Sequence, residues 1–447
     1  MKNFALILLM LSVTFAMATE RYKDRLFPVS VKKDVAYAKN VPHLSSYHKI
    51  TEGLLIYKLI SDDATVAYFY TDEKTTTNKD LLLDLYTPKG DTEKNRPAVI
   101  VAHGGAMVAG ARNDYAQHTV NYCDSLAARG YVTASVEYRL GVSLTEKNYQ
   151  LHIDSVDFAR AVYRGVQDIR AAVRYMRANA SSLGIDPNRI YLVGNSAGAI
   201  LSLENVYAPM YRDFPEYIHK STPNLGGLDD YGEQASYSTA NGVAALWGAV
   251  HDPSLIGSSP VPVLLIHGTA DETVYFKAGR PLSDVAGTLE NIIPSTMAAT
   301  AASYTLDLHA PTLFGSYVID SVLTKKGISH ETYFVEGVGH EFYDEDAYTA
   351  KVQEKVFNFL YSMTQSTTGI KTVVASRPSL VRMGEKNMNF TVSGSKTLRY
   401  RVVDLRGRAV FSGNVSPEEV VDLSSLEKGV YVLQVSGEKP LRFSIVY

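Results

Sequence analysis

The sequence of 447 residues has a single cysteine, Cys123, and a single tryptophan, Trp247. One thiol excludes an intrachain disulfide, a cysteine-ligated zinc site and an iron–sulfur cluster. The sequence also lacks a surplus of either charge, with 44 Lys+Arg, 47 Asp+Glu and a net charge of −3. This balance argues against nucleic acid and an anionic membrane surface as partners, because both select basic proteins.

Long hydrophobic runs are missing after the N-terminal segment, so no membrane span is expected in the mature chain. The N-terminus itself has Lys2 followed by an apolar run, Phe4–Ala18, that ends Ala16-Met17-Ala18. A basic start, a short apolar stretch and an A-x-A end predict a signal peptide over residues 1–18. An uncleaved N-terminal anchor is the alternative. We therefore expect an exported protein.

The composition, 46% hydrophobic and 20% charged residues, is typical of a globular protein. Strand and helix patterns alternate from about 64 to 364, whereas short alternating strands follow from about 371. This order predicts a doubly wound, mostly parallel α/β sheet followed by a small all-β sandwich. The expected division is an α/β domain over 19–364, a linker over 365–371 and a sandwich over 372–447.

Two stretches interrupt the alternation, one near 207–241 and one near 276–326. We interpret both as insertions over the edge where the parallel strands end, which is where a substrate pocket forms in such sheets. The first is rich in tyrosine. Its rings are candidates for stacking on a sugar or an aromatic acyl group, with ordinary packing as the alternative: Tyr207, Tyr211, Tyr217, Tyr231 and Tyr237.

The segment Gly194-Asn195-Ser196-Ala197-Gly198 fits the pattern G-x-S-x-G. It lies between a predicted strand, Ile190–Val193, and a predicted helix, which is the context that a nucleophilic serine requires. Glycine is needed two residues before and after the serine, because side chains there would clash in so tight a turn. We therefore expect Ser196 to be a nucleophile at the positive end of a helix.

A serine hydroxyl becomes nucleophilic when a histidine takes its proton and a carboxylate orients that histidine. Asp271 follows the predicted strand Val261–His267, and Glu272 beside it is the alternative acid. His340 follows the predicted strand Glu331–Val335. Since parallel strands end at one edge of the sheet, the sequence predicts a Ser196–His340–Asp271 triad there.

The oxyanion formed during such chemistry requires fixed N–H donors. One predicted donor is the N–H of Ala197, directly after the nucleophile. The others are expected in the loop after the apolar strand Ala98–Ala102, where Gly104, Gly105 and Ala106 are candidates that the sequence does not rank. The loop histidine, His103, is expected to shape this loop through a hydrogen bond.

Four segments together resemble the α/β-hydrolase superfamily, in particular its hormone-sensitive-lipase-like and feruloyl or acetyl-xylan esterase-like branch. They are His103–Ala106, Val136–Leu140, Asp168–Tyr175 and Asp186–Gly198. The resemblance implies hydrolysis of carboxylic esters without a cofactor or a metal, with acetyl or feruloyl esters of plant polysaccharide as candidate substrates. The family usually has a third glycine where this chain has Ala106.

Two other functions use the same scaffold. A serine peptidase of the prolyl-oligopeptidase type would share the triad, but such enzymes usually carry a large propeller ahead of the hydrolase domain, and the segment before the first predicted strand is too short for one. A non-catalytic surface adhesin is the second alternative. An adhesin would need neither a triad nor a glycine loop, so the presence of both in the sequence argues against this alternative.

The C-terminal segments Val403–Val410 and Val421–Val432 resemble the sorting domain of type IX secretion. The resemblance implies the secretion machinery as a partner and a secreted or cell-surface location. A carbohydrate-binding or adhesive sandwich is the alternative, although no row of tryptophans supports it. In the α/β domain, His267 is expected to be a satisfied core residue, and Arg139 and Asp168 buried structural partners.

Overall fold

The computed structural model describes most of the α/β region and the strands of the C-terminal region. The predicted signal peptide, and the predicted linker beyond residue 365, lie outside the described residues. The described residues are 19–49, 67–113, 118–234, 237–257, 261–283, 287–288, 305–340, 342, 346–365, 381–383, 389–392, 397–404, 409–417, 419–427, 429–435 and 441–445.

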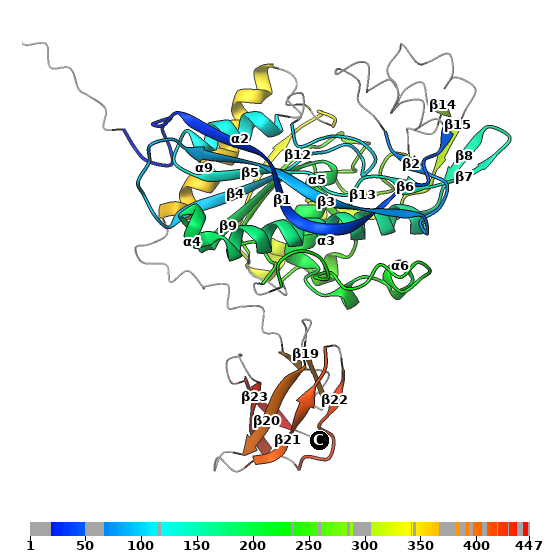
Figure 1. Ribbon diagram of the computed structural model, residues 1–447, viewed down its shortest axis with the longest axis vertical. Helices are drawn as coiled ribbons and strands as arrows, with labels where there is room; N and C mark the ends of the chain where they lie inside the picture. The colour runs from blue at the N-terminus through cyan, green and yellow to red at the C-terminus, as the bar shows by residue number, and fades with distance from the viewer. Residues whose placement is uncertain are drawn as a thin grey trace, which may run out of the picture.

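An eight-stranded sheet forms the centre of the α/β region (Figure 1), in the order β1-β3-β5-β4-β9-β10-β12-β17. The strands from β5 to β17 run parallel, and β1 and β3 are antiparallel to their neighbours. The predicted doubly wound, mostly parallel sheet is confirmed. Its strands are β1 (Val29–Leu44), β3 (Thr76–Pro88), β4 (Arg96–Ala102), β5 (Val132–Val136), β9 (Ile185–Asn195), β10 (Val243–Leu246), β12 (Val263–Gly268) and β17 (His330–Val335).

Helices cover both faces of this sheet, because its inner strands are apolar on both sides. In β4, Ala98 and Ile100 pack in the core shared with α3 and α5, whereas Val99 and Val101 pack in the core shared with α2 and α9. The helices are α2 (Thr119–Ala127), α3 (Ser155–Ala178), α4 (Ala180–Leu183), α5 (Ala197–Tyr207), α6 (Glu216–His219), α8 (Ser316–Lys326) and α9 (Asp346–Gln365), with 3-10 turns η1 (Tyr211–Asp213) and η2 (Pro253–Leu255).

Strand β9 begins earlier than the sequence predicted. We expected a turn at residues 186–188, but the strand already pairs at Ile185 and bulges before it pairs again at Ile190. Asp186 Oδ1 accepts a hydrogen bond from the Asn188 N–H at 2.8 Å within this bulge. The predicted turn is present at residues 186–188, but β9 pairs with β4 on both sides of it, so the strand includes the turn.

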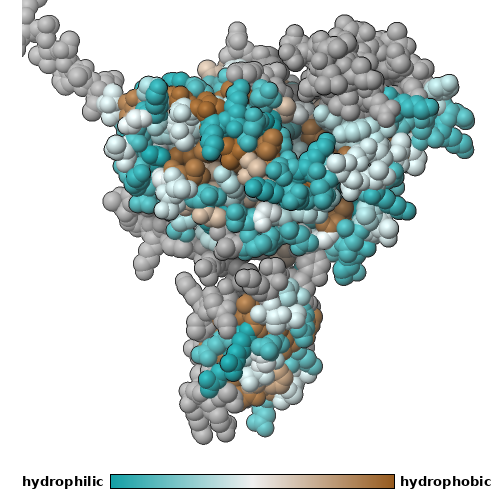
Figure 2. All heavy atoms as spheres, viewed as in Figure 1, coloured by the Kyte–Doolittle hydropathy of each residue, from teal (hydrophilic) through white to brown (hydrophobic). Residues whose placement is uncertain are grey.

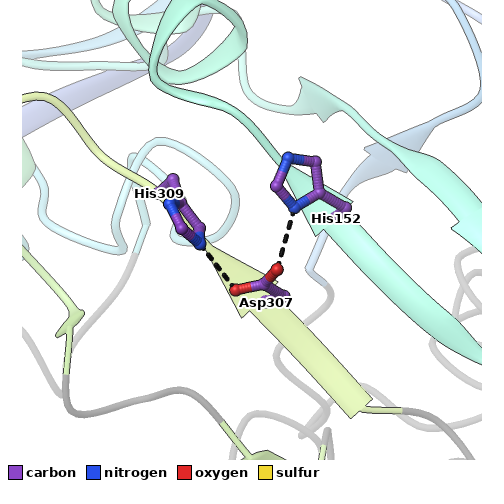
Figure 3. A group of neighbouring side chains, drawn as sticks. All are labelled: His152, Asp307 and His309. Carbon is purple, nitrogen blue, oxygen red and sulfur yellow. Dashed lines mark hydrogen bonds and ion pairs between the residues drawn. The ribbon is translucent and has the colours of Figure 1, made fainter.

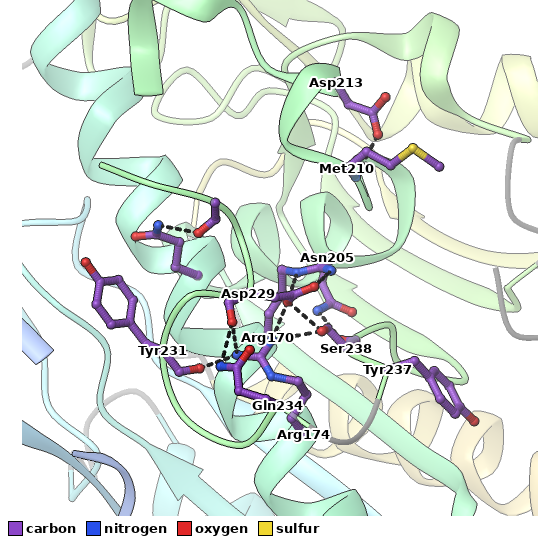
Figure 4. Close-up of polar contacts among 12 residues, drawn as sticks. Arg170, Arg174, Asn205, Met210, Asp213, Asp229, Tyr231, Gln234, Tyr237 and Ser238 are labelled. Atoms are coloured by element: carbon purple, nitrogen blue, oxygen red, sulfur yellow. Dashed lines mark hydrogen bonds and ion pairs between the residues drawn. The ribbon is translucent and has the colours of Figure 1, made fainter. Parts of the chain in front are cut away.

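The insertion near 207–241 lies along α3 in its described part, not chiefly over the strand edge as we expected (Figure 4). Arg170 binds both carboxylate oxygens of Asp229 at 2.8 Å, and Arg174 donates to Ser238 Oγ at 2.8 Å. Charge-assisted pairs of this kind are strong and directional. The guanidinium groups of α3 therefore fix the course of this insertion.

The tyrosines of this insertion are largely used for packing. Tyr207 is buried in the core, and the rings of Tyr231 and Tyr237 lie 4.8 Å and 3.7 Å from the guanidinium carbons of Arg139 and Arg177. Tyr217 remains exposed. Three of the five candidate stacking rings are thus occupied by the protein itself.

The second insertion is shorter than predicted. Helix α8 was included in it, but its Ile319 and Leu323 are fully buried in the core, and it forms the crossover between β12 and β17 that a parallel pair requires. The inserted part therefore ends at β16. The small strands of the region are β2 (Phe69–Tyr70), β6 (Val142–Ser143), β7 (Thr145–Lys147), β8 (Gln150–Ile153), β11 (Ala249–Val250), β13 (Ala278–Gly279), β14 (Gly287–Thr288), β15 (Thr305–Leu308) and β16 (Leu313–Gly315).

The described part of the C-terminal region is all β, as predicted, with one sheet β21-β20-β23-β24 and one sheet β18-β19-β22. It has a hydrophobic core of its own, with Phe390, Val402 and Leu423 fully buried. Its strands are β18 (Val381–Met383), β19 (Asn389–Val392), β20 (Leu398–Asp404), β21 (Ala409–Val415), β22 (Val421–Asp422), β23 (Gly429–Val435) and β24 (Leu441–Ile445).

The surface is mixed in polarity, as expected for a globular protein of this composition. On the face seen in Figure 2, hydrophilic residues predominate among those described, with hydrophobic residues in small groups between them. Within the described ranges, none of the helices combines the length and the apolar character needed to cross a bilayer.

An ion pair between the buried Glu204 and the partly buried His251 joins α5 to the residue that follows β11. His251 Nδ1 lies 2.9 Å from Glu204 Oε2, and its Nε2 lies 2.9 Å from the carbonyl oxygen of Asp213. Both ring nitrogens face acceptors, so both carry protons. Burial lowers the pKa of His251, but the Glu204 carboxylate outweighs it and raises the pKa to about 9.

This pair predicts a loss of stability at alkaline pH. Since the folded-state pKa of His251 is raised, its stabilisation is complete below about pH 6.5 and is lost as pH rises through about 9. At most the loss is on the order of 3 kcal/mol. Unfolding midpoints measured from pH 6 to pH 10 should fall more steeply for the native chain than for His251→Gln, with His43→Gln as control. Parallel curves for His251→Gln and the native chain would contradict the prediction.

Candidate active site

Ser196 stands in the turn between the end of β9 and the start of α5. Its backbone has φ 50° and ψ −118°, a conformation that costs energy for a residue with a side chain. The Ser196 N–H donates to the Leu246 carbonyl oxygen at 2.9 Å, which anchors the turn to β10. The strained turn presents the hydroxyl group at the carboxyl edge of the sheet, beside the N-terminus of α5.

The glycines on either side of Ser196 are required by space. A Cβ atom on Gly194 would lie 2.3 Å from the Gly198 carbonyl oxygen, and one on Gly198 would lie 2.2 Å from the Ala102 carbonyl oxygen. Both are backbone atoms, which have no room to move away. The steric reason that the sequence suggested for the G-x-S-x-G pattern is thus found in the structure.

His340 and Asp271 meet Ser196 from two other strand ends. His340 Nε2 lies 3.0 Å from Ser196 Oγ, and His340 Nδ1 lies 2.7 Å from Asp271 Oδ2. Because the carboxylate only accepts, Nδ1 donates to it, and in the neutral ring Nε2 is left to accept the serine proton. The structure therefore brings the three predicted residues into one hydrogen-bonded chain. The alternative acid, Glu272, is exposed.

The Asp271 carboxylate is strongly favoured in its charged form. Its Oδ1 accepts the N–H groups of Thr273 and Val274, each at 2.9 Å. Burial raises the pKa of Asp271, but hydrogen bonds from His267 and His340 outweigh burial and lower the pKa to about 2. The carboxylate is therefore ionised throughout the neutral range, as an acid that orients a histidine must be.

Two further residues, His267 and Trp247, contact the site, and neither was predicted as part of it. His267 is buried, as expected, but its Nε2 lies 3.0 Å from Asp271 Oδ2. Trp247 is also buried, and its ring packs edge-on against the His340 ring with centroids 6.1 Å apart. One feature of the sequence could have indicated the contact between His267 and Asp271. These residues are four positions apart across the end of a predicted strand.

The glycine loop after β4 is formed in the way an oxyanion site requires. Gly105, Ala106 and Met107 all have positive φ, at 103°, 54° and 63°. A Cβ on Gly105 would lie 2.2 Å from the Ala109 carbonyl oxygen. Among the described residues, no acceptor is found for the N–H groups of Gly105, Ala106 and Ala197, so these groups can donate to an oxyanion.

The carbonyl group of Gly104 helps to shape this loop. Its oxygen lies 2.7 Å from His103 Nδ1 and 3.2 Å from the Tyr138 hydroxyl, and the two rings stack with centroids 4.4 Å apart. His103 thus shapes the loop through a hydrogen bond, as the sequence suggested. Arg139 and Asp168, also interpreted as structural, form a buried pair in which Arg139 Nε lies 2.9 Å from Asp168 Oδ1.

Two segments of the chain match known families. Residues 83–222 match the BD-FAE family, and residues 385–443 match the family described as secretion system C-terminal sorting domain. The first segment contains the glycine loop and Ser196. The second contains most of the C-terminal strands.

Curated proteins and solved structures add more distant similarity. Esterase LipC of Mycobacterium tuberculosis is 29% identical over 221 residues, which are 44% of this chain and 50% of LipC. Neuroligin-like protein glit-1 of Caenorhabditis elegans is 27% identical over 170 residues, 37% of this chain and 20% of that protein. The chain thus spans half or less of the length of these relatives. The propionate-bound esterase 2 of Thermogutta terrifontis is 22% identical with a TM-score of 0.42, covering 66% of this chain and 94% of that one.

The two family matches agree with the sheet order and with the separate β region. Over residues 83–222 the chain is thus similar to the BD-FAE family, and over residues 385–443 it is similar to secretion system C-terminal sorting domains.

Proposed function

We propose that this protein is an exported serine carboxylesterase. The observation that carries the proposal is the hydrogen-bonded chain from Ser196 Oγ through the His340 ring to Asp271 Oδ2, with distances of 3.0 Å and 2.7 Å. This order of hydroxyl, imidazole and buried carboxylate is what nucleophilic catalysis by serine requires.

Acylation starts when Ser196 Oγ attacks the ester carbonyl carbon while its proton passes to His340 Nε2. The charged imidazole is stabilised by Asp271, whose carboxylate stays ionised. The new oxyanion accepts hydrogen bonds from the N–H of Ala197 and from Gly105 or Ala106, at the positive end of α5. His340 then donates its proton to the leaving alcohol oxygen, the C–O bond breaks, and the acyl group stays on Ser196.

Deacylation repeats these steps with water. His340 Nε2 takes a proton from the water molecule as its oxygen attacks the acyl carbon. The same N–H groups bind the second oxyanion. His340 finally returns the proton to Ser196 Oγ, and the carboxylic acid is released. Neither half-reaction needs a cofactor or a metal ion.

The substrate and the location extend the proposal. Acetyl or feruloyl esters of plant polysaccharide are the proposed substrates, on the resemblance of the BD-FAE segment alone. The sorting domain supports export by the type IX machinery to the cell surface or the medium.

Replacing the nucleophile tests the proposal directly. Ser196→Ala should lower kcat/KM for p-nitrophenyl acetate by at least about a thousandfold, since triad members act as a unit. It should also abolish labelling by a fluorophosphonate probe, with the label of the native chain mapped to Ser196 by mass spectrometry.

A matched control lies on the same helix. Ser202 is a buried serine whose hydroxyl donates to the Gly198 carbonyl oxygen at 2.7 Å. Ser202→Ala should keep activity within a few-fold of the native chain and should still be labelled. Near-native hydrolysis by Ser196→Ala would overturn the proposal.

A substrate panel separates the esterase from its two rivals. We expect turnover of short p-nitrophenyl esters, and of acetylated xylan or feruloyl esters, to exceed that of X-Pro amides by at least about a hundredfold in kcat/KM, each corrected for its uncatalysed rate. Preferred hydrolysis of the amides would instead indicate a peptidase. No turnover and no probe labelling would indicate a binding protein.

A further inference from the structure

Three side chains with metal-binding atoms converge outside the active site (Figure 3). His152 Nδ1 lies 3.0 Å from Asp307 Oδ2, and His309 Nε2 lies 2.8 Å from Asp307 Oδ1. One ligand atom from each residue can be chosen so that all lie within 4.8 Å of one another. Their side chains are 43%, 39% and 50% exposed, so solvent and ions reach them.

The strand pairing explains why these residues meet. β15 runs parallel to β8, and Asp307 is the register partner of His152. His309 lies two residues beyond Asp307, and its N–H donates to the Ile153 carbonyl oxygen at 2.9 Å, which continues the pairing. Partners in register and residues two apart share one face of a sheet. The opposite face of β8 carries Leu151, which is fully buried.

We propose that His152, Asp307 and His309 form a binding site for a divalent transition metal ion, with Zn²⁺ as the ion that fits best. Two imidazole nitrogens and one carboxylate oxygen are a ligand set that Zn²⁺ commonly takes, and bonds of about 2.0–2.1 Å place tetrahedral ligand atoms about 3.3 Å apart. The distance from one imidazole nitrogen to the ligating carboxylate oxygen, 2.8 Å or 3.0 Å, needs to open by a few tenths of an ångström, and the other ligand atoms, which lie within 4.8 Å of one another, need to move closer together. Ca²⁺ and Mg²⁺ are disfavoured because they select oxygen ligands.

The metal would act as a clamp, not as a catalyst. Asp307 and His309 belong to the inserted segment between β12 and α8, whereas His152 belongs to β8, which directly precedes α3. The ion would join the two segments in a chain whose single cysteine allows no disulfide. Each imidazole must bind the ion through a nitrogen without a proton, so the proton that it now donates to Asp307 moves to the other ring nitrogen. An imidazolium ring has no free nitrogen to bind the ion, so the affinity falls in acid.

Zinc titration of the full chain tests the proposal. The protein, without a histidine tag and stripped with a chelator, is titrated calorimetrically with ZnCl₂ at pH 7.5 and at pH 5. We expect about one equivalent bound at pH 7.5 with a dissociation constant in the micromolar range, at least tenfold weaker binding at pH 5, and a rise in unfolding temperature. CaCl₂ at the same concentrations should neither bind nor stabilise.

Variants identify the ligands. His152→Ala, Asp307→Asn and His309→Ala should each weaken Zn²⁺ binding at least tenfold, and should remove the thermal shift. His330→Ala is the matched control, because His330 Nε2 faces one carboxylate, Asp320, at 2.8 Å, without a third ligand among the described residues. Less than about 0.2 equivalent of zinc bound at pH 7.5, or unchanged affinity in the three variants, would overturn the proposal.

A second inference concerns His267 and rests on the proposed function. His267 Nε2 lies 3.0 Å from Asp271 Oδ2 and 2.9 Å from the Val274 carbonyl oxygen. Both partners are acceptors, so this nitrogen carries a proton. Asp271 Oδ2 is also the oxygen that faces His340 Nδ1. One carboxylate oxygen thus receives two imidazole N–H groups.

The rest of the surroundings hold the His267 ring in place. Its Nδ1 lies 2.8 Å from Ser316 Oγ on α8, and the Phe276 ring packs edge-on against it with centroids 5.5 Å apart. His267 is fully buried. Asp271 is the charged group that it faces. We infer that His267 is a positioning residue that fixes Asp271 Oδ2 in the direction of His340 and shares its negative charge.

Removing this donor should change the pH profile as well as the rate. His267→Ala should lower kcat about 10- to 100-fold with KM within about twofold. Without the His267 N–H, the Asp271 carboxylate keeps more of its negative charge for the protonated His340 ring and holds that ring more tightly. The acid limb of the kcat/KM profile should therefore move to higher pH. His267→Gln, which places an N–H donor at a similar reach, should restore most of the rate.

The readouts separate this inference from the proposed function and from simple misfolding. The active fraction of each variant is titrated with the fluorophosphonate probe, and His219→Ala, at another buried histidine, serves as control. An unchanged acid limb and rate in His267→Ala, in a native chain that hydrolyses esters, would overturn the inference alone. Lack of esterase activity in the native chain would overturn the proposed function and this inference with it.

Discussion

The close contact between the turn at Ser196 and the neighbouring strand β4 is the constraint on which the site depends. Gly198 lies so close to the Ala102 carbonyl oxygen that no Cβ atom fits between them. This contact brings the start of α5 against the end of β4, and the glycine loop begins at the next residues. This single close contact between backbone segments therefore positions the proposed nucleophile, the helix terminus and the proposed oxyanion donors.

The parallel sheet supplies the remaining groups at the same edge. Asp271 follows β12 and His340 follows β17, and these strands are adjacent in the sheet. Their register fixes how far each loop extends beyond the edge. The proposed triad thus joins residues that are 144 and 69 positions apart in the chain. A rigid, apolar sheet can hold such residues within hydrogen-bonding distance without help from a cofactor or a disulfide.

Ion pairs from the arginines of α3 hold the segments that pack against this helix. Arg160 and Arg164 both bind the Glu73 carboxylate, while Arg170 and Arg174 bind Asp229. Buried guanidinium groups are costly unless each is paired, and these pairs leave little freedom for the segments that carry the carboxylates. The insertion near 207–241 is thereby tied to the scaffold over the length of the helix. Its position was out of reach of sequence patterns, since an exposed acidic residue and a bound one look alike in the sequence.

The sequence by itself determined the fold class, the order of the main strands and the choice of Ser196, Asp271 and His340 as candidates. These follow from local rules, because apolar runs form buried strands and a G-x-S-x-G turn requires glycine on both sides of the serine. Only the tertiary structure decided that His267 contacts Asp271, that α8 is a crossover helix, and that Asp307 lies in register with His152. Each of these depends on pairing or packing between segments far apart in the chain, and no local pattern encodes such distances.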